Sequence, residues 1–260
     1  MTQVLVTRPE QDAASWVTSL QNAGYEAIQF PLLDLKAVLT PTDMPAVLAK
    51  IQSSQAAMFV SANAVRFLAQ SFQSNPEWVM PFHQSTRAWC TGPGTAAALL
   101  ACGIPQNQID QPHADAKQLD SEALWQVVQG QIVSPFKVLF VRGADETGAI
   151  AGRDWLVSQL DVFGAKTDAM AAYQRQASQL TNIQIQQVTH WLDQKAIWVF
   201  SSSACVQSLV DQCQHVDWSK AKSVVTHPRI AALAQQYGWR NTTIAPPGMK
   251  GLLASIKSMA

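Results

Sequence analysis

Two polar tripeptides, Ser61-Ala62-Asn63 and Ser201-Ser202-Ser203, follow apolar runs of the kind that forms buried strands. Serine and asparagine at a helix start accept hydrogen bonds from its first amides, and unpaired amides there attract anions. The tripeptides are therefore either helix caps or sites for anionic groups such as carboxylates. Each serine alone is better explained as a cap, whereas the matched pair favours neither interpretation.

Other polar residues follow apolar runs in the same way. Arg8 and Arg142 are expected to end the strands that begin at residues 4 and 138. In open α/β sheets, ligands bind at the carboxyl ends of the strands, so these junctions could converge on a ligand. The substrate-binding candidates are Arg8, Ser61, Ala62, Asn63, Gly92, Thr95, Arg142, Gly143, Ser202, Ser203, Thr226 and Pro228.

A glycine-rich stretch, GPGTAA from Gly92 to Ala97, fits the dinucleotide pattern G-x-G-x-x-(G/A). The matching stretch in the second half of the chain begins His227-Pro228-Arg229 and keeps only the proline. The candidate acid, Asp110, lies in a polar segment with prolines rather than at a clean strand end. A proline-containing helix start is the better interpretation, and a NAD-linked enzyme stays an alternative.

Among titratable side chains, Tyr173 in AMAAYQRQA draws attention because this stretch matches IQFPLLDL (28–35) in the other half. A tyrosine phenol keeps its proton at neutral pH, so at a domain junction it could protonate a leaving hydroxyl. It could equally be an amphipathic interface residue with a solvated hydroxyl. Residue type alone favours the second interpretation.

The elements that would position these residues occur twice. VLFVRG from 138 resembles VLVTRP from 4, IWVFSSSACV from 197 resembles AAMFVSANAV from 56, and VVTHPRIAAL from 224 resembles WCTGPGTAAA from 89. In each half, short runs rich in valine, phenylalanine and isoleucine alternate with segments of helical period. This alternation predicts an α/β protein with parallel strands, and the repeated order predicts two similar domains.

Composition narrows the function classes. The chain has 260 residues, 48% of them hydrophobic, and a formal net charge of zero, which argues against a nucleic-acid binder that relies on a basic surface. It shows no secretory signal and no apolar run long enough for a membrane helix, so no membrane partner is expected. The four cysteines form no C-x-x-C pair and the histidines no cluster, which predicts buried thiols in a reducing cytoplasm and no zinc site.

Taken together, the ordered stretches resemble the uroporphyrinogen-III synthase family. They run from VLVTRPE near residue 4 to LLASI near the end of the chain, and include FVSANAVRFL, TGPGTAAAL, VLFVRGADETG and VFSSSACVQSLV. The resemblance implies two flavodoxin-like parallel-sheet domains that flank a cleft and are joined by a two-segment linker. One domain would comprise residues 1–35 and 175–260, and the other residues 36–174.

The resemblance also implies the reaction: hydroxymethylbilane is dehydrated and cyclised with inversion of its last pyrrole ring, giving uroporphyrinogen III. Tyr173 matches the family's tyrosine and would be the catalytic proton donor, with no metal or cofactor. Val60 and Ile230 depart from threonines found in members of the family. A cytoplasmic monomer with transient contact to the upstream bilane-forming enzyme is expected. The alternative is a non-catalytic two-lobed α/β ligand-binding protein.

Overall fold

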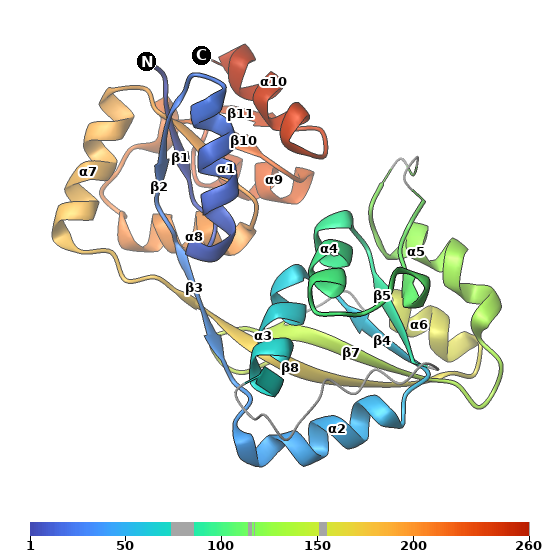
Figure 1. The fold of residues 1–260 in the computed structure, drawn as a ribbon. Coiled ribbons are helices and arrows are strands. Elements are labelled where there is room, and N and C mark those ends of the chain that lie inside the picture. Colours follow the sequence, from blue (N-terminus) through green and yellow to red (C-terminus); the bar gives the residue numbers. More distant parts are fainter. Residues whose placement is uncertain (74–85, 114–115, 117, 151–154, 260) are drawn as a thin grey trace. The chain divides into compact units, whose positions relative to one another are not determined.

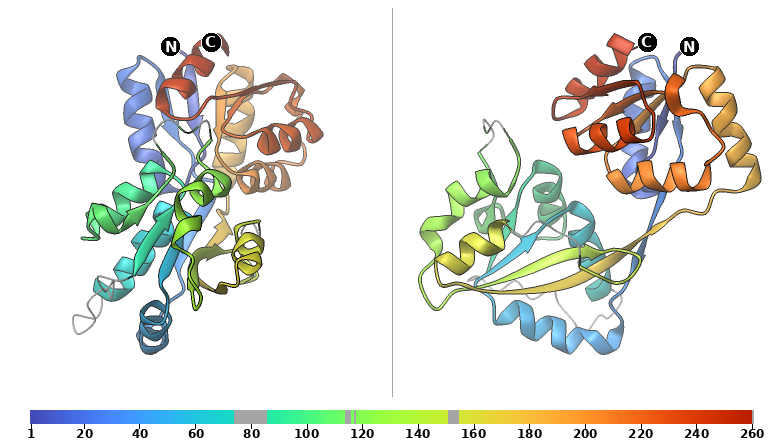
Figure 2. Two further views of the ribbon diagram at one scale, coloured as in Figure 1. Left: turned by 90° about the vertical axis from the view of Figure 1, so that its right-hand side faces the viewer. Right: turned by 180° about the vertical axis from the view of Figure 1, so that it is seen from behind.

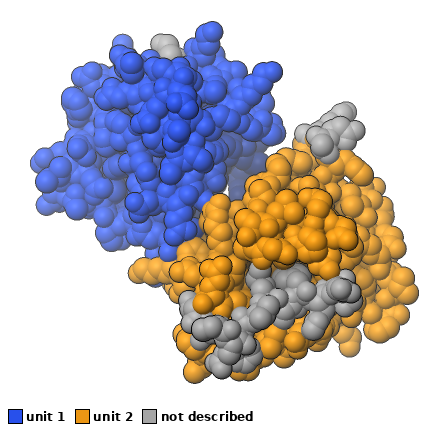
Figure 3. Space-filling view, viewed as in Figure 1, with its two compact units in different colours: residues 1–35, 176–260 blue, residues 36–175 orange. Residues whose placement is uncertain are grey.

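The computed structural model describes residues 1–73, 86–113, 116, 118–150 and 155–259. The chain divides into two compact units, which are coloured separately in Figure 3. Unit 1 comprises residues 1–35 and 176–260, and unit 2 comprises residues 36–175. The chain therefore leaves unit 1 once and returns to it once.

Unit 1 is built on a five-stranded parallel sheet in the order β11-β10-β9-β1-β2 (Figure 1). The strands are β1 (Gln3–Val6), β2 (Glu26–Gln29), β9 (Ile197–Phe200), β10 (Lys222–Val225) and β11 (Asn241–Ile244). The helices are α1 (Glu10–Asn22), α7 (Asn182–Asp193), α8 (Ser203–Gln212), α9 (Pro228–Gln236) and α10 (Met249–Met259), with a 3₁₀ turn at Trp218–Lys220. After α1 the chain turns at Gly24, whose φ of 87° suits a residue without a side chain.

Helices cover both faces of this sheet (Figure 2), which explains why its central strands are apolar throughout. Val4 and Val6 of β1 point to the face covered by α1 and α10, where they pack in a cluster with Leu20 and Leu252. Leu5 points to the opposite face, which is covered by α7, α8 and α9. That second core holds four buried tryptophans, Trp191, Trp198, Trp218 and Trp239.

Unit 2 contains most of a six-stranded sheet in the order β3-β8-β7-β4-β5-β6. The strands are β3 (Leu33–Ala37), β4 (Ala56–Phe59), β5 (Arg87–Cys90), β6 (Ile109–Asp110), β7 (Lys137–Ala144) and β8 (Lys166–Ala177). The helices are α2 (Met44–Gln52), α3 (Ala62–Gln73), α4 (Pro93–Ala101), α5 (Ser121–Val128) and α6 (Trp155–Val162), with 3₁₀ turns at Pro41–Asp43, Gln106–Gln108 and Gln129–Gln131. The chain passes between the units within β3 and β8, which are neighbours in this sheet.

The two sheets repeat one strand order. Counted along the chain, the strands of unit 1 lie in the order 2-1-3-4-5, which is that of flavodoxin-like folds. The same order appears in unit 2 if β7 is counted first, because β8-β7-β4-β5-β6 then corresponds to β2-β1-β9-β10-β11. The segments that match in sequence thus occupy matching strands: β1 with β7, β4 with β9, and β5 with β10.

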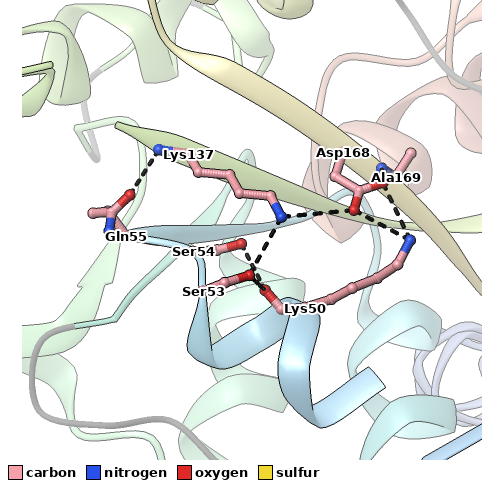
Figure 4. A network of polar contacts seen from close by, with 7 residues as sticks. All are labelled: Lys50, Ser53, Ser54, Gln55, Lys137, Asp168 and Ala169. Carbon is pink, nitrogen blue, oxygen red and sulfur yellow. Dashed lines mark hydrogen bonds and ion pairs between the residues drawn. The ribbon is translucent and has the colours of Figure 1, made fainter. Parts of the chain in front are cut away.

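A polar network joins α2 to the sheet of unit 2, at the amino ends of the strands β7 and β8 (Figure 4). Lys50 Nζ of α2 lies 3.2 Å from Asp168 Oδ1 of β8, and Lys137 Nζ of β7 lies 3.8 Å from Asp168 Oδ2. Burial alone would raise the pKa of Asp168, but the hydrogen bond and charge of Lys50, with the charge of Lys137, lower it. Because these side chains are still 31–39% exposed, water screens their charges, and the network positions α2 more than it stabilises the unit.

The four cysteines are free, and three of them, Cys90, Cys205 and Cys213, are buried. Desolvation raises the pKa of the Cys90 thiol to about 11 and that of Cys205 to about 12. An exposed thiol in the unfolded chain ionises near pH 8.5. Between these values the unfolded chain binds fewer protons than the folded protein, so alkali favours unfolding.

We therefore expect the free energy of unfolding to fall as pH rises above about 9, by at most about 1.4 kcal/mol per pH unit for each buried thiol. Urea denaturation at pH 8, 9 and 10, followed by tryptophan fluorescence, measures this slope. Cys205→Ala should make the slope shallower, whatever its effect on stability at pH 8. An unchanged slope in that variant would rule out the thiol as its cause.

Candidate functional site

Tyr173 is the centre of a compact group of side chains in unit 2. Its hydroxyl lies 3.2 Å from Ser61 Oγ, and its ring stacks on Phe67 with centroids 5.4 Å apart and planes inclined by 22°. Only 5% of the residue is exposed. Water therefore has little access to the phenol, which lies in a medium of low dielectric.

The backbone of Gly143 forms another wall around the tyrosine. An added Cβ at this glycine would lie 2.5 Å from Tyr173 Cζ and 2.8 Å from its hydroxyl oxygen. Contacts below about 3 Å between such atoms are repulsive, so any side chain at Gly143 would displace the ring. The glycine is thus explained by the close approach of the aromatic ring to the backbone.

A register shift between β7 and β8 brings these two residues together. Arg142 pairs with Ala171, but Gly143 pairs with Tyr173, which leaves Ala172 as the extra residue. Irregularities of this β-bulge type change the direction of the side chains that follow. Without the shift, Gly143 would pair with Ala172, and Tyr173 would pair with Ala144.

Ser61 lies between β4 and α3 and caps the helix. Its Oγ accepts a hydrogen bond of 3.1 Å from the Ala64 amide, as expected for an N-terminal serine. Ala62 is the first residue of α3, and the buried Asn63 accepts a hydrogen bond of 3.0 Å from Arg66 Nη1. Within this tripeptide, Ser61 forms the hydrogen bond to Tyr173.

These residues lie at a topological switch point. In unit 2 the strand order reverses between β7 and β4, where the chain leaves the adjacent strands in opposite directions. Crevices at the carboxyl ends of such strands are the usual ligand sites of open α/β sheets. Ser61 follows β4 and Gly143 lies at the end of β7, so the Tyr173 group occupies the position that the topology favours.

The expected strand end at Arg142 is wrong. Strand β7 continues to Ala144, because Gly143 and Ala144 still pair with β8. The arginine is therefore inside the strand, with 6% of its surface exposed and its guanidinium carbon 4.6 Å from the centroid of the Phe140 ring. A cation over an aromatic face is a stabilising contact, and it places Arg142 in the packing of unit 2.

The glycine-rich stretch starts a helix, as the proline predicted. Gly92 is the N-cap of α4 in an extended conformation, Pro93 is the first helical residue, and Thr95 is buried. Asp110, the acid that a dinucleotide site would require, is buried in an ion pair with Arg87, whose Nη2 lies 2.6 Å from Oδ1. Because this carboxylate is engaged by a guanidinium, it is poorly placed to bind a ribose, which favours the helix-start interpretation.

The candidates of unit 1 lie at the corresponding edge of the other sheet. Arg8 follows β1, with Nη2 3.8 Å from Asp12 Oδ2 and its guanidinium carbon 4.4 Å from the centroid of the Trp16 ring. Ser202 caps α8 by accepting a hydrogen bond of 3.2 Å from the Ala204 amide. Ser203 is the first residue of that helix.

The third junction of unit 1 is capped by a residue that sequence reasoning did not assign. Thr226 and Pro228 are exposed at the start of α9, but the N-cap is His227, whose Nδ1 accepts a hydrogen bond of 3.1 Å from the Arg229 amide. His227 caps α9 in unit 1 at the position that Gly92 has before α4 in unit 2. The structure thus brings Ser61 and Gly143 to Tyr173 and adds Phe67. Ala62, Asn63 and Arg142 are neighbours of these residues along the chain, and the remaining candidates lie at other junctions.

The described residues contain neither a metal centre nor a membrane segment. No group of three or more histidine, cysteine, aspartate or glutamate side chains in this part of the chain could hold a metal ion. Among the described helices, none combines the length and the hydropathy that a membrane span requires.

Comparison with known proteins gives one consistent family. The family model described as uroporphyrinogen-III synthase HemD matches residues 14–254. The chain is similar to uroporphyrinogen-III synthase of Escherichia coli K12, with 25% identity over 252 residues, 93% of this chain and 94% of the relative. A relative from Chlorobaculum parvum is 30% identical over 151 residues, which cover 58% of this chain and 56% of the relative.

Solved structures of the same family share the fold. Uroporphyrinogen-III synthetase from Helicobacter pylori 26695 aligns over 100% of both chains, with a TM-score of 0.65 and 15% sequence identity. A mutant enzyme from the extreme thermophile Thermus thermophilus aligns over 100% of this chain and 98% of its own, with a TM-score of 0.58 and 12% identity. These likenesses confirm the predicted α/β class with two parallel-sheet domains.

Proposed function

The chain belongs to the uroporphyrinogen-III synthase family, and on that premise we propose that Tyr173 is the proton donor of its reaction. The activity is that of the family, a hydro-lyase of tetrapyrrole biosynthesis, and the family implies hydroxymethylbilane as the substrate. The observation that carries the assignment is the placement of the phenol. It lies at a topological switch point, among Ser61, Phe67 and Gly143.

Proton donation would act on the first step. As the hydroxymethyl C–O bond breaks, its electron pair moves to oxygen, which takes the phenol proton and leaves as water. The pyrrole nitrogen supplies electrons to the carbon, giving the azafulvene cation. General-acid assistance of this kind is typically worth roughly 10²–10⁴ in rate.

The later steps depend on orientation. The substituted carbon of the last ring attacks the cation to form a spiro intermediate, which fragments and closes again with that ring inverted. The proton released when the last ring regains its aromaticity restores the phenol, so protons balance over one turnover. Because the bilane also closes in solution without inversion, the protein's main contribution would be to hold the last ring in the reactive orientation.

Binding of the carboxylate arms is assigned to residues at and near the carboxyl ends of the strands in each unit, where helix amides, hydroxyls and guanidinium groups can hold anions. The proposed substrate-binding residues are Arg8, Ser61, Ala62, Asn63, Gly92, Thr95, Arg142, Gly143, Ser202, Ser203, Thr226 and Pro228. We further propose that the functional domains are residues 1–35 with 175–260 and residues 36–174.

The remaining expectations concern the location, oligomeric state, partners and cofactors of the protein. Free cysteines support the proposed cytoplasmic location, because thiols persist in reducing compartments. A monomeric state and a transient contact with the upstream bilane-forming enzyme stay predictions. No metal or cofactor takes part in the proposed steps, since each proton is accounted for by Tyr173 and the substrate.

The alternative, a non-catalytic two-lobed binding protein, makes a different prediction for the bilane. Such a protein would hold hydroxymethylbilane without speeding its disappearance. We expect the rate of bilane consumption to rise in proportion to the concentration of this protein. A rate independent of protein concentration, together with measurable binding of the bilane, would contradict the enzyme and support the alternative.

A further inference from the structure

We propose that Ser61 is a positioning residue that directs the proton of Tyr173 toward the substrate and stabilises the phenolate left behind. This inference rests on the proposed role of Tyr173. It changes the role of Ser61 from contact with a carboxylate arm to action through the tyrosine. Three observations carry it: the helix-cap hydrogen bond at Ser61, the length of the bond to Tyr173, and the packing of the tyrosine ring.

The helix cap leaves the hydroxyl hydrogen of Ser61 free to donate. The Ser61 oxygen accepts the amide hydrogen of Ala64, and an amide can only donate. The hydroxyl hydrogen of Ser61 remains available to an acceptor, and the Tyr173 oxygen lies 3.2 Å away. Either hydroxyl could donate this bond, and the proposed role requires Ser61 to be the donor. With Ser61 as the donor of that bond, the tyrosine keeps its own hydrogen free for the leaving hydroxyl of the substrate.

The hydrogen bond between Ser61 and Tyr173 is long in the resting protein, and it should strengthen as the tyrosine loses its proton. Hydroxyl–hydroxyl hydrogen bonds usually span 2.5–3.0 Å, so the 3.2 Å between Ser61 Oγ and the Tyr173 hydroxyl is a weak bond in the resting protein. When Tyr173 gives up its proton, its oxygen becomes an anion, and bonds to such oxygens are shorter and about twice as strong. An interaction that strengthens only as charge develops lowers the barrier without tightening substrate binding.

Packing holds the Tyr173 phenol in one orientation relative to Ser61. Phe67 of α3 lies against one face of the tyrosine ring, and the backbone of Gly143 lies close to the end of the ring that carries the hydroxyl. Ser61 caps the helix to which Phe67 belongs, so one element positions both the donor and the stacking ring. The phenol therefore only has to shorten this hydrogen bond during proton transfer.

The first test replaces Ser61 with alanine and with threonine. We expect Ser61→Ala to lower kcat about 10- to 100-fold, the effect of a lost hydrogen bond to a charged group, with KM nearly unchanged. Threonine keeps both a hydroxyl and a capping oxygen, so Ser61→Thr should recover most of kcat. A rise in KM at constant kcat would overturn the proposal and return Ser61 to direct substrate binding.

The second test is a double-mutant cycle with Tyr173→Phe. If Ser61 acts through the phenol, Ser61→Ala should cause no further loss of kcat once the phenol is absent. A further loss of the same factor in that background would overturn the inference while leaving Tyr173 as the donor. A Tyr173→Phe variant with full kcat would instead overturn the proposed role of Tyr173.

A matched control separates catalysis from helix capping. Asp120 caps α5 in the same unit by accepting a hydrogen bond of 2.9 Å from the Ala123 amide. Asp120→Ala should lower the urea midpoint of unfolding about as much as Ser61→Ala does, because each variant loses one cap. Its kcat should stay at the wild-type value, and an equal loss of kcat in both variants would assign the Ser61 effect to the cap.

Discussion

Tyr173→Phe is expected to lower kcat by roughly 10²–10⁴, the usual contribution of a general acid. The substitution removes only the hydroxyl, so the ring still stacks on Phe67 and still fits against Gly143. Ser61 keeps its bond to the Ala64 amide. Stability should therefore change little, and the loss should lie in the chemical step, as single-turnover measurements with hydroxymethylbilane would show.

A second tyrosine provides the control for this variant. The Tyr237 hydroxyl in unit 1 donates a hydrogen bond of 2.6 Å to Gln207 Oε1, so Tyr237→Phe also removes a bonded phenol hydroxyl. It should leave kcat unchanged. Because slow catalysis lets spontaneous closure compete, the fraction of type I isomer in the product should rise in Tyr173→Phe and stay unchanged in Tyr237→Phe. Full kcat in Tyr173→Phe would remove this residue from the proton-transfer step.

Gly143→Ala has the second largest expected effect, because its Cβ would lie 2.5 Å from Tyr173 Cζ. An ordinary carbon–carbon contact is about 1 Å longer, so the ring must move by roughly that amount away from Gly143. Misplacement of a reacting group by about 1 Å can cost roughly 10²-fold in rate. Overpacking should also destabilise the protein by about 1–3 kcal/mol, which urea denaturation measures.

Gly130 provides a matched glycine in the same unit. An added Cβ there meets no atom within 4 Å, so Gly130→Ala should change neither kcat nor stability by a comparable amount. A further comparison uses the Gly143→Ala substitution in the Tyr173→Ala background, where no ring remains to be displaced. The destabilisation by Gly143→Ala should largely disappear there. If it persists, the clash with the tyrosine is not its cause.

Much of the fold could be predicted because the strands of covered parallel sheets are apolar throughout and the helices between them have a regular period. The repeat of the strand-end motifs gave the matching strands of the two units, β1 with β7 and β4 with β9. Position at the strand ends identified Ser61 and Gly143 as candidates, and position together with the match to the family's tyrosine identified Tyr173, but neither showed their contacts.

The remaining features depend on long-range pairing. No local signal shows that β7 extends past Arg142, because that extension is fixed by pairing with β8. The stacking of Phe67 on Tyr173 likewise depends on the extra residue Ala172, which redirects the tyrosine. The ion pair of Arg87 with Asp110 joins residues that meet only when β5 and β6 are neighbours.

The most direct test of the central claim is the isomer that this protein forms from freshly made hydroxymethylbilane. The reaction is stopped within the first turnovers, the products are oxidised to porphyrins, and the type I and type III isomers are separated by chromatography. We expect mainly type III with the wild-type protein and type I alone in its absence. Formation of type I alone in the presence of the wild-type protein would contradict the account.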